Sequence, residues 1–516
     1  MNVGTGHGAG RTAGILAALL GLFIVAVLWA KTGKVAAASG GDEVWMGEGA
    51  YWLLKEGVHR YHFLADEHGH QIVSTFQPIS AAFTAVLFAL FGLGPFTLMA
   101  QVPVVGTAAM VLLALIGRRL ELPGWLCLLL PGAAWGLMTV ERRLNIVRWE
   151  PMVAMWMLLA FWLLLEARGR KGAGAGWLRA LAGVSVTLAG VTYYPLAPFC
   201  LLAGTGAAVL TAGMTPWREV PRRNAAFVAG GVVSGGLFLA WIFKNYESFY
   251  RQVVAFGGEH YLSVANLLWP FVNLWRPGSM VDWVCILEHA GLAGLAGWIW
   301  FRRPDGPWRA AAWATLWMLA PIFLFRRPVL DVTGGLFGVL VLAGFVAPGR
   351  RWAAAALWLL ALAGAGKFLL HGYTMVAQGE KRSYPLFQEK LLAVVGDGPG
   401  AVASSQFTWL ALRERKGPKE YHFIAKYGDP SYAYRSTELR SAEGIRSLRY
   451  LILGDGFDDL IRIHYPEMQA AIDDGTFVQK ARIEMPRQET PWSKAAIFEC
   501  TVLENTGWKP DSVNED

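Results

Sequence analysis

The sequence predicts a mainly α-helical membrane protein: a polytopic module of about eleven transmembrane helices followed by a small α/β domain. Three observations predict this class. The 516 residues are 54% hydrophobic and only 16% charged, which is too apolar for a soluble protein of this length. Apolar runs suited to crossing a bilayer recur from residue 14 to residue 369, and ordinary polarity follows. Basic residues cluster between these runs, as membrane topology demands.

The first predicted element is an uncleaved transmembrane helix at 14–30. Arg11, this apolar run and the small residues at 36–39 also fit a cleavable signal peptide. We prefer the helix, because the run is long enough to span a bilayer and many more apolar segments follow it.

The remaining apolar segments predict the other crossings. They lie at 96–117, 122–139, 150–166, 177–192, 195–212, 225–243, 282–301, 309–325, 329–347 and 351–369. The run 79–93 is also apolar, but it is short, begins after Pro78 and ends in the breaker sequence Gly92-Leu93-Gly94-Pro95. We expect it to lie at the membrane interface rather than to cross.

The charged connections predict the orientation. With the amino terminus in the cytoplasm and 79–93 not counted, every even-numbered connection is basic, as the positive-inside rule requires. These connections contain Arg118-Arg119, the 168–179 loop, Arg218 with Arg222-Arg223, Arg302-Arg303 with Arg309, and Arg350-Arg351. The outer loops 31–95 and 244–281 and the region after 370 then lie on the periplasmic or extracytoplasmic side of the inner (cytoplasmic) membrane.

The change in polarity predicts two domains, a transmembrane module at 1–371 and a soluble extracytoplasmic domain at 372–516. In the second, YLILG (450–454) and AAIFECTVL (495–503) read as strands, and 458–474 reads as helix. The sequence therefore predicts a small α/β domain on the outer side.

Acids and arginines gather at the predicted outer face. The acids Asp42 and Glu43 follow the first helix, and two further stretches, VERRLNIVRWEP (140–151) and LFRRPV (324–329), contain Arg142, Arg143, Arg148, Glu150, Arg326 and Arg327. Arginines on this face oppose the positive-inside tendency, and an anionic lipid head group, especially a phosphate, would explain them. Alternatively, they snorkel toward lipid heads and pair with Glu141 and Glu150, while Glu43 and Glu48 are solvated.

The order of these features resembles the GT-C superfamily of membrane glycosyltransferases, particularly the bacterial relatives of dolichyl-phosphate-mannose protein mannosyltransferases and of the lipid A aminoarabinose transferase. Those proteins have one helix, then an outer loop that opens with an acidic pair, matched by Asp42-Glu43, and a pattern like YWLLKEG at 51–57. A proline-led apolar segment ending in "lfG" follows, here at 77–92. Arg148-Trp149-Glu150-Pro151 resembles the family's second outer loop.

The resemblance is best over 14–250, and the sequence departs from the family pattern at two positions. Gln77-Pro78 replaces a double proline, and Glu150 replaces the more usual Asp.

The resemblance implies a hexosyl- or pentosyltransferase that moves a sugar from a polyprenyl-phosphate-linked donor to an unidentified envelope acceptor: protein, lipid A, glycan or lipid. The leaving group of such a donor is already a phosphate, which departs without being protonated. The reaction therefore mainly needs a base that takes the proton from the acceptor hydroxyl. Asp42 is the family-matched base, and Glu43 and Glu150 would orient it or contact the acceptor. Arginines would hold the donor phosphate, and our candidates are Arg148, Arg142, Arg143, Arg326 and Arg327.

Other site hypotheses remain open at the level of sequence. Tyr193, between two helices on the outer side, is a candidate for substrate binding or an interfacial anchor. The sequence requires no cofactor; a metal such as zinc could bind at His62, Glu67, His68 and His70, but a surface loop is preferred because their spacing matches no helical or knuckle arrangement. The net charge of +8 indicates no nucleic-acid partner, because the basic residues lie between spans.

Two other classes of function are compatible with the chain. A transporter or flippase for a lipid-linked or small polar substrate would need ionisable or broken segments in mid-membrane, or symmetric halves. A scaffold that displays the outer domain is the other. The glycosyltransferase hypothesis predicts that Asp42→Asn abolishes transfer and leaves folding intact.

Overall fold

The computed structural model describes the chain in segments. These are residues 42–65, 71–73, 77–144, 148–212, 219–250, 280–303, 306–321, 332–346, 349–378, 384–396, 400–404, 408, 411–412, 421–423, 441–454, 461–462, 465–484 and 500–509. The chain divides into two compact units. The described residues within 77–80 and 101–372 belong to unit 1, and those within 42–73, 81–100 and 373–509 belong to unit 2.

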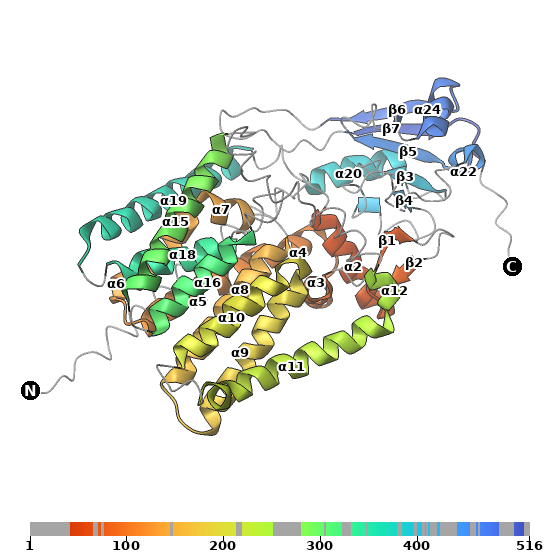
Figure 1. Cartoon of the computed structure of the whole chain (residues 1–516). Helices are drawn as coiled ribbons and strands as arrows, with labels where there is room; N and C mark the ends of the chain where they lie inside the picture. Colours follow the sequence, from red (N-terminus) through yellow and green to blue (C-terminus); the bar gives the residue numbers. More distant parts are fainter. Residues whose placement is uncertain are drawn as a thin grey trace, which may run out of the picture. The chain divides into compact units, whose positions relative to one another are not determined.

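The secondary-structure elements described in unit 1 are all helices (Figure 1). Its helices are α5 (Gln101–Arg119), α6 (Gly124–Gly136), α7 (Met138–Leu144), α8 (Trp149–Arg168), α9 (Ala173–Thr192), η1 (Tyr194–Leu196), α10 (Ala197–Thr211), α11 (Val220–Lys244), α12 (Tyr246–Phe249), α15 (Met280–Arg302), α16 (Gly306–Leu319), α18 (Val332–Gly344) and most of α19 (Arg351–Gln378).

By length and composition, seven helical segments of the described chain can cross a membrane. They are Thr97–Arg119, Trp149–Arg168, Ala173–Thr192, Tyr194–Thr211, Val220–Lys244, Trp283–Arg302 and Arg351–Leu370. Shorter apolar helices lie at α3 (Pro78–Phe91), α6 and α18. A helix overlaps each predicted crossing from 96 to 369, whereas 14–30 lies outside the described residues. The count of eleven crossings, their orientation and the interfacial position of 79–93 stay predictions.

Small residues allow the helices of unit 1 to pack closely. Helix α9 packs between α8 and α11, and α16 packs between α10 and α18. A Cβ added at Gly183 of α9 would overlap the carbonyl oxygen of Phe227 in α11, and one at Gly230 would overlap that of Ala180. Membrane helices associate by such close backbone contact, because lipid tails give them no hydrophobic drive toward one another.

Unit 2 combines segments from the two ends of the described chain. It contains α2 (Asp42–Glu56), β1 (Arg60–Ala65), β2 (Gln71–Val73), most of α3, α4 (Pro95–Met99), α20 (Tyr384–Val395), β3 (Val402–Ser404), β4 (Tyr421–Phe423), α22 (Ala442–Ser447), β5 (Tyr450–Gly454), α24 (Pro466–Asp473), β6 (Phe477–Ile483) and β7 (Cys500–Asn505). Five strands form a mixed sheet in the order β4-β3-β5-β7-β6: β3 is parallel to β4 and β5, and β7 is antiparallel to β5 and β6. Strands β1 and β2 form a separate antiparallel pair.

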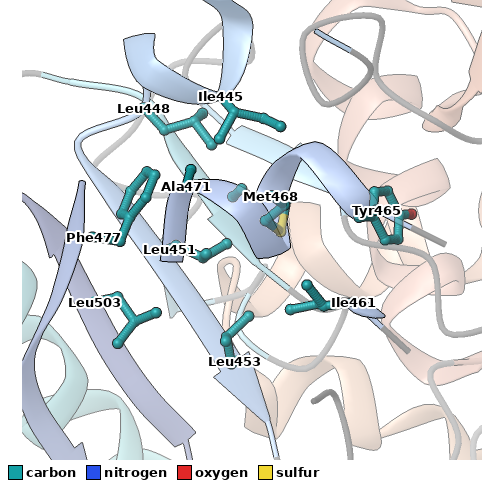
Figure 2. Packing of buried hydrophobic residues seen from close by; sticks show 11 residues of the cluster. Ile445, Leu448, Leu451, Leu453, Ile461, Tyr465, Met468, Ala471, Phe477 and Leu503 are labelled. Carbon is teal, nitrogen blue, oxygen red and sulfur yellow. The ribbon is translucent and has the colours of Figure 1, made fainter. Parts of the chain in front are cut away.

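An apolar core joins this sheet to α22 and α24 (Figure 2). Leu451 of β5 and Leu503 of β7 lie beside Met468 and Ala471, which are three residues apart and therefore on one face of α24. Helix α24 starts with Pro466, whose fixed φ and missing N–H suit a first turn. Strand β5 coincides with the predicted strand 450–454, and β7 overlaps the end of the predicted strand 495–503.

Candidate functional site

The predicted acidic pair opens a helix. Asp42 and Glu43 are the first two residues of α2, where negative charge is favourable because the helix dipole presents its positive end there. Their side chains lie outside what the structure describes, so the base assignment stays a prediction.

The rest of α2 is held firmly within unit 2. Glu48 is only 4% exposed, and the indole Nε1 of Trp52 donates to its carboxylate at 3.4 Å. The Arg60 guanidinium covers the Trp52 ring at 4.1 Å and pairs with Glu56 at 2.6 Å. The expectation that Glu48 is solvated is therefore wrong, because its face of α2 is packed. A helix fixed in this way gives the acids at its amino end a rigid support.

The second predicted group gathers where α8 begins in unit 1. The Nε of Arg148 lies 3.2 Å from a carboxylate oxygen of Glu150, whose side chain has no exposed surface. Arg148 precedes the helix in extended backbone, and Glu150 lies in the first turn, where a carboxylate is stabilised by the helix dipole. The guanidinium of Arg148 also lies 4.8 Å from the centre of the Trp149 ring. Arg148 is therefore held by both a charge and an aromatic face.

Tyr193 joins this group through Trp149. The two rings stack at 5.1 Å with an interplanar angle of 25°, and Tyr193 is 5% exposed at the end of α9. The amide of Gln101, on α5, donates to the carbonyl oxygen of Arg148 at 3.3 Å. Three helices thus fix one short segment, and three of the predicted site residues, Arg148, Glu150 and Tyr193, lie together.

Several predicted site residues lie outside what the structure describes. For Arg142 and Arg143 it gives the backbone of α7, without the side chains. The others are Arg326, Arg327 and the metal candidates His62, Glu67, His68 and His70, whose side chains are not described. Among the side chains that are described, no group of three His, Cys, Asp or Glu residues could hold a metal ion. The hypothesis of a metal at 62–70 is not tested by this.

The structure also reveals a polar contact that the sequence analysis missed. Glu288 of α15 accepts hydrogen bonds from the backbone N–H groups of Met138 and Thr139, at 2.7 and 3.3 Å. Lys367 of α19 donates to the carbonyl oxygen of Gly136 at 2.8 Å. Both residues lie in apolar helices, and a charged residue in a membrane span is a signal of function. That signal is present in the runs 282–301 and 351–369.

Comparison with known proteins gives matches in structure and none in sequence. No family model matches the chain, and no curated protein matches it significantly. ArnT from Cupriavidus metallidurans has a similar structure in the apo state, with 12% identity and a TM-score of 0.63 over 95% of this chain and 98% of ArnT. ArnT bound to undecaprenyl phosphate gives 14% identity and a TM-score of 0.61, covering 95% and 99%.

Two other solved structures share the arrangement. The Archaeoglobus fulgidus oligosaccharyltransferase tethered with an acceptor peptide has 10% identity and a TM-score of 0.52, covering 95% of this chain and 74% of its own. The arabinofuranosyltransferase AftD from Mycobacteria has 15% identity and a TM-score of 0.53, and this chain spans 40% of its length. All these proteins are GT-C glycosyltransferases. Together with its apolar helices, this similarity identifies the chain as a multi-pass membrane protein with the GT-C fold.

Proposed function

We propose that the chain is an integral-membrane glycosyltransferase that moves a sugar from a polyprenyl-phosphate-linked donor to an acceptor in the cell envelope. The observation that carries the proposal is the similarity to ArnT, which extends over nearly the whole of both chains. ArnT has been captured with undecaprenyl phosphate, the kind of molecule that remains when such a donor has given up its sugar.

In the proposed reaction, the acceptor hydroxyl attacks the anomeric carbon of the sugar as the bond from that carbon to the phosphate oxygen breaks. The polyprenyl phosphate leaves with the electron pair of that bond, and Asp42 takes the acceptor proton. No general acid is required, since a phosphate is stable as an anion. This division of labour suits a site with a carboxylate and arginines.

Arg148 is the described candidate for stabilising the phosphate. Its guanidinium is held by Glu150 and Trp149 before any substrate arrives, and such preorganisation is what makes electrostatic stabilisation effective. Glu150 would then act through Arg148, as a positioning residue. Arg142, Arg143, Arg326 and Arg327 are proposed as further phosphate ligands, with Tyr193 as a support for Trp149.

The location follows from the donor. Its phosphate is confined to the head-group layer while its tail remains in lipid, so the base must lie at that depth. The positive-inside rule supports a location for these groups at the extracytoplasmic face of the inner membrane, together with the domain after residue 372.

A gene deletion complemented with variants tests the proposal. Mass spectrometry of envelope glycans and glycolipids is expected to show one sugar modification that disappears on deletion and returns with the wild-type gene. Asp42→Asn should reach the same membrane level and restore nothing, whereas Glu443→Gln, on an exposed turn of α22, should restore it fully. A deletion strain with an unchanged envelope would refute the transferase proposal; restoration by Asp42→Asn would refute only the base.

A transporter or flippase is the second candidate, because Glu288 and Lys367 lie in apolar helices. Both side chains bind backbone groups of the same turn, however, which gives them a role without a transported substrate. Proteoliposomes separate the two functions: a flippase moves a labelled lipid-linked sugar between leaflets without an acceptor, and a transferase does not.

A further inference from the structure

We propose that Glu288 and Lys367 are positioning residues of the transfer reaction, which fix the turn at 136–139 and thereby direct α7. The inference rests on the proposed function, because α7 carries Arg142 and Arg143, two of the proposed ligands of the donor phosphate. It adds two residues from distant helices that lie outside the sequence motifs around Asp42 and Arg148.

The turn needs an external partner. Helix α6 ends at Gly136, and Leu137 has extended backbone with φ −66° and ψ 134° before α7 begins at Met138. The first N–H groups of a helix have no acceptor within the helix. Glu288 supplies one: its two oxygens accept from the N–H groups of Met138 and Thr139 and from the Thr139 hydroxyl, the last at 3.2 Å. Hydrogen bonds to a carboxylate are about twice as strong as neutral ones.

Lys367 holds the other side of the same turn. Its ammonium binds the Gly136 carbonyl at 2.8 Å, beside a very close contact between α6 and α19. A Cβ added at Gly136 would overlap the carbonyl oxygen of Leu360, and one at Gly364 would overlap that of Gly132. This contact leaves little freedom for the end of α6.

The charges link the two holding residues to α7 itself. Lys367 interacts electrostatically with Glu288 and with Glu141, which directly precedes Arg142. A charged side chain in the apolar part of a membrane helix is costly, most of all at mid-membrane. An uncharged cap could satisfy a helix start without that cost. A site that must hold arginines in one orientation against a phosphate gives a reason for the charged arrangement.

The contacts also agree with the predicted orientation. Glu288 lies in the first half of α15, Lys367 lies in the second half of α19, and the turn follows α6. The positive-inside rule predicts that these parts of the three helices lie toward the extracytoplasmic side. The turn is thus predicted to lie toward the face where the proposed donor phosphate lies.

Binding of undecaprenyl phosphate to the full chain in nanodiscs tests the proposal. The variants are Glu288→Gln, Lys367→Met and Lys367→Arg, with Glu166→Gln as the matched control. Glu166 is a buried carboxylate near the carboxyl end of α8 that pairs with Arg119 and Arg170, so its substitution removes a buried negative charge far from the turn. Each variant is measured for hydrogen exchange in 136–144, for the dissociation constant and for the thermal midpoint.

Glu288→Gln and Lys367→Met are expected to raise exchange at 136–144 and to weaken undecaprenyl phosphate binding about tenfold, the effect of losing one hydrogen bond to a charged group. Lys367→Arg keeps the charge and the donors and should bind like wild type. Glu166→Gln should change neither the exchange in 136–144 nor the dissociation constant by more than about twofold. This should hold even if its thermal midpoint falls as much as that of Glu288→Gln.

Three outcomes overturn the proposal and can be told apart. Unchanged exchange in Glu288→Gln means that the carboxylate does not hold the turn. Raised exchange with unchanged binding means that the turn is held for stability alone. Wild-type protein that binds no undecaprenyl phosphate overturns the proposed donor, and the positioning role with it, while the exchange data still report the contact.

Discussion

The Nε of Arg148 lies 3.2 Å from the carboxylate of Glu150, and the Glu150 side chain is fully removed from solvent. A carboxylate in such a place remains charged only if a partner offsets its desolvation. Arg148 is that partner, and it keeps 19% of its own side-chain surface exposed. The pair therefore buries the anion and leaves the cation partly exposed, and the alternative in which these arginines pair with glutamates also predicts this contact.

Removing the anion should affect both stability and binding. Glu150→Gln leaves Arg148 partly buried without its charge partner, so we expect a loss of about 3 kcal/mol in stability and weaker binding of undecaprenyl phosphate. Thermal unfolding in detergent and a binding titration measure the two effects.

Glu219→Gln is the control for this prediction. It breaks the exposed pair with Arg223, where both side chains are about half exposed, and should cost less than about 0.5 kcal/mol. Equal effects of the two substitutions would show that burial of Glu150 has no special energetic role.

Most helices of unit 1 could be predicted, because a bilayer requires about 20 apolar residues in each span and such runs are visible in the sequence. Their interruptions were harder. The predicted segment 122–139 contains the end of α6, a turn at Leu137 and the start of α7. The residue that stabilises this break is Glu288, far along the chain, and nothing in the sequence around Leu137 indicates that contact. Strands β3 and β4 were missed because three residues are too few to show alternation.

The candidate site was predictable only where a motif named it. The motifs supplied Arg148 and Glu150, but their pairing and the stack of Trp149 on Tyr193 depend on how α8 and α9 meet. Glu48 shows the opposite case: a charged residue read as solvated is buried because Trp52 lies one turn away and donates to it. Glu288 and Lys367 carried a local signal, a charge inside an apolar run, whose partners only the fold reveals.

Close packing of α9 on α11 predicts that small substitutions there are costly. Gly183→Ala and Gly230→Ala place a Cβ into a backbone carbonyl of the facing helix, so the helices must separate. We expect each to destabilise unit 1 by about 1–3 kcal/mol. Hydrogen exchange of the α9 and α11 amides measures the effect.

Gly231→Ala is the matched control on the same helix. Its nearest neighbour, the Thr187 Oγ1, would lie 3.7 Å from the added Cβ, an ordinary contact. The substitution should change the free energy by less than about 0.5 kcal/mol. Because alanine has the higher helix propensity, a Gly231→Ala loss as large as that of Gly183→Ala would mean that the loss does not come from the close backbone contact at Gly183 and Gly230.

The side-chain hydrogen bonds of Asn505 predict that unit 2 is sensitive to substitution at this residue. Its amide nitrogen donates to the carbonyl oxygens of Arg446 and Leu448, at 2.7 and 3.0 Å, and its oxygen accepts from the N–H of Gly507. Asn505→Asp puts an oxygen against two carbonyl oxygens, so we expect a loss of about 1–3 kcal/mol. Exchange of the β5 and β7 amides in the full chain reports it.

The control is Gln469→Ala, which loses an exposed hydrogen bond to Asp473. It should leave exchange in the sheet unchanged within about 0.5 kcal/mol. If Asn505→Asp is equally silent, the connection between β7 and the residues before β5 does not stabilise the sheet.

The pair of Lys480 and Glu504 predicts how unit 2 responds to acid. The Lys480 ammonium lies 3.0 Å from the Glu504 carboxylate and 3.1 Å from the Tyr450 hydroxyl. Partial burial raises the pKa of Glu504, but hydrogen bonds with Lys480 and Tyr450 and the positive charge of Lys480 together lower it below its ordinary value of 4.5. Glu504 therefore contributes stability fully above pH 4.5, and that contribution is lost as the pH falls through the lowered pKa.

Glu504→Gln should remove this contribution. Because both side chains keep about a third of their surface exposed, we expect a difference from wild type of no more than about 1 kcal/mol near neutral pH, shrinking as the pH falls below 4.5. Exchange in β6 and β7, measured as the difference between wild type and Glu504→Gln at several pH values, gives the profile. Glu484→Gln, which removes a more exposed carboxylate at the end of β6, should give a smaller difference. A Glu504→Gln difference that stays constant from neutral pH to pH 3 would show that the carboxylate stabilises the sheet by packing and not by its charge.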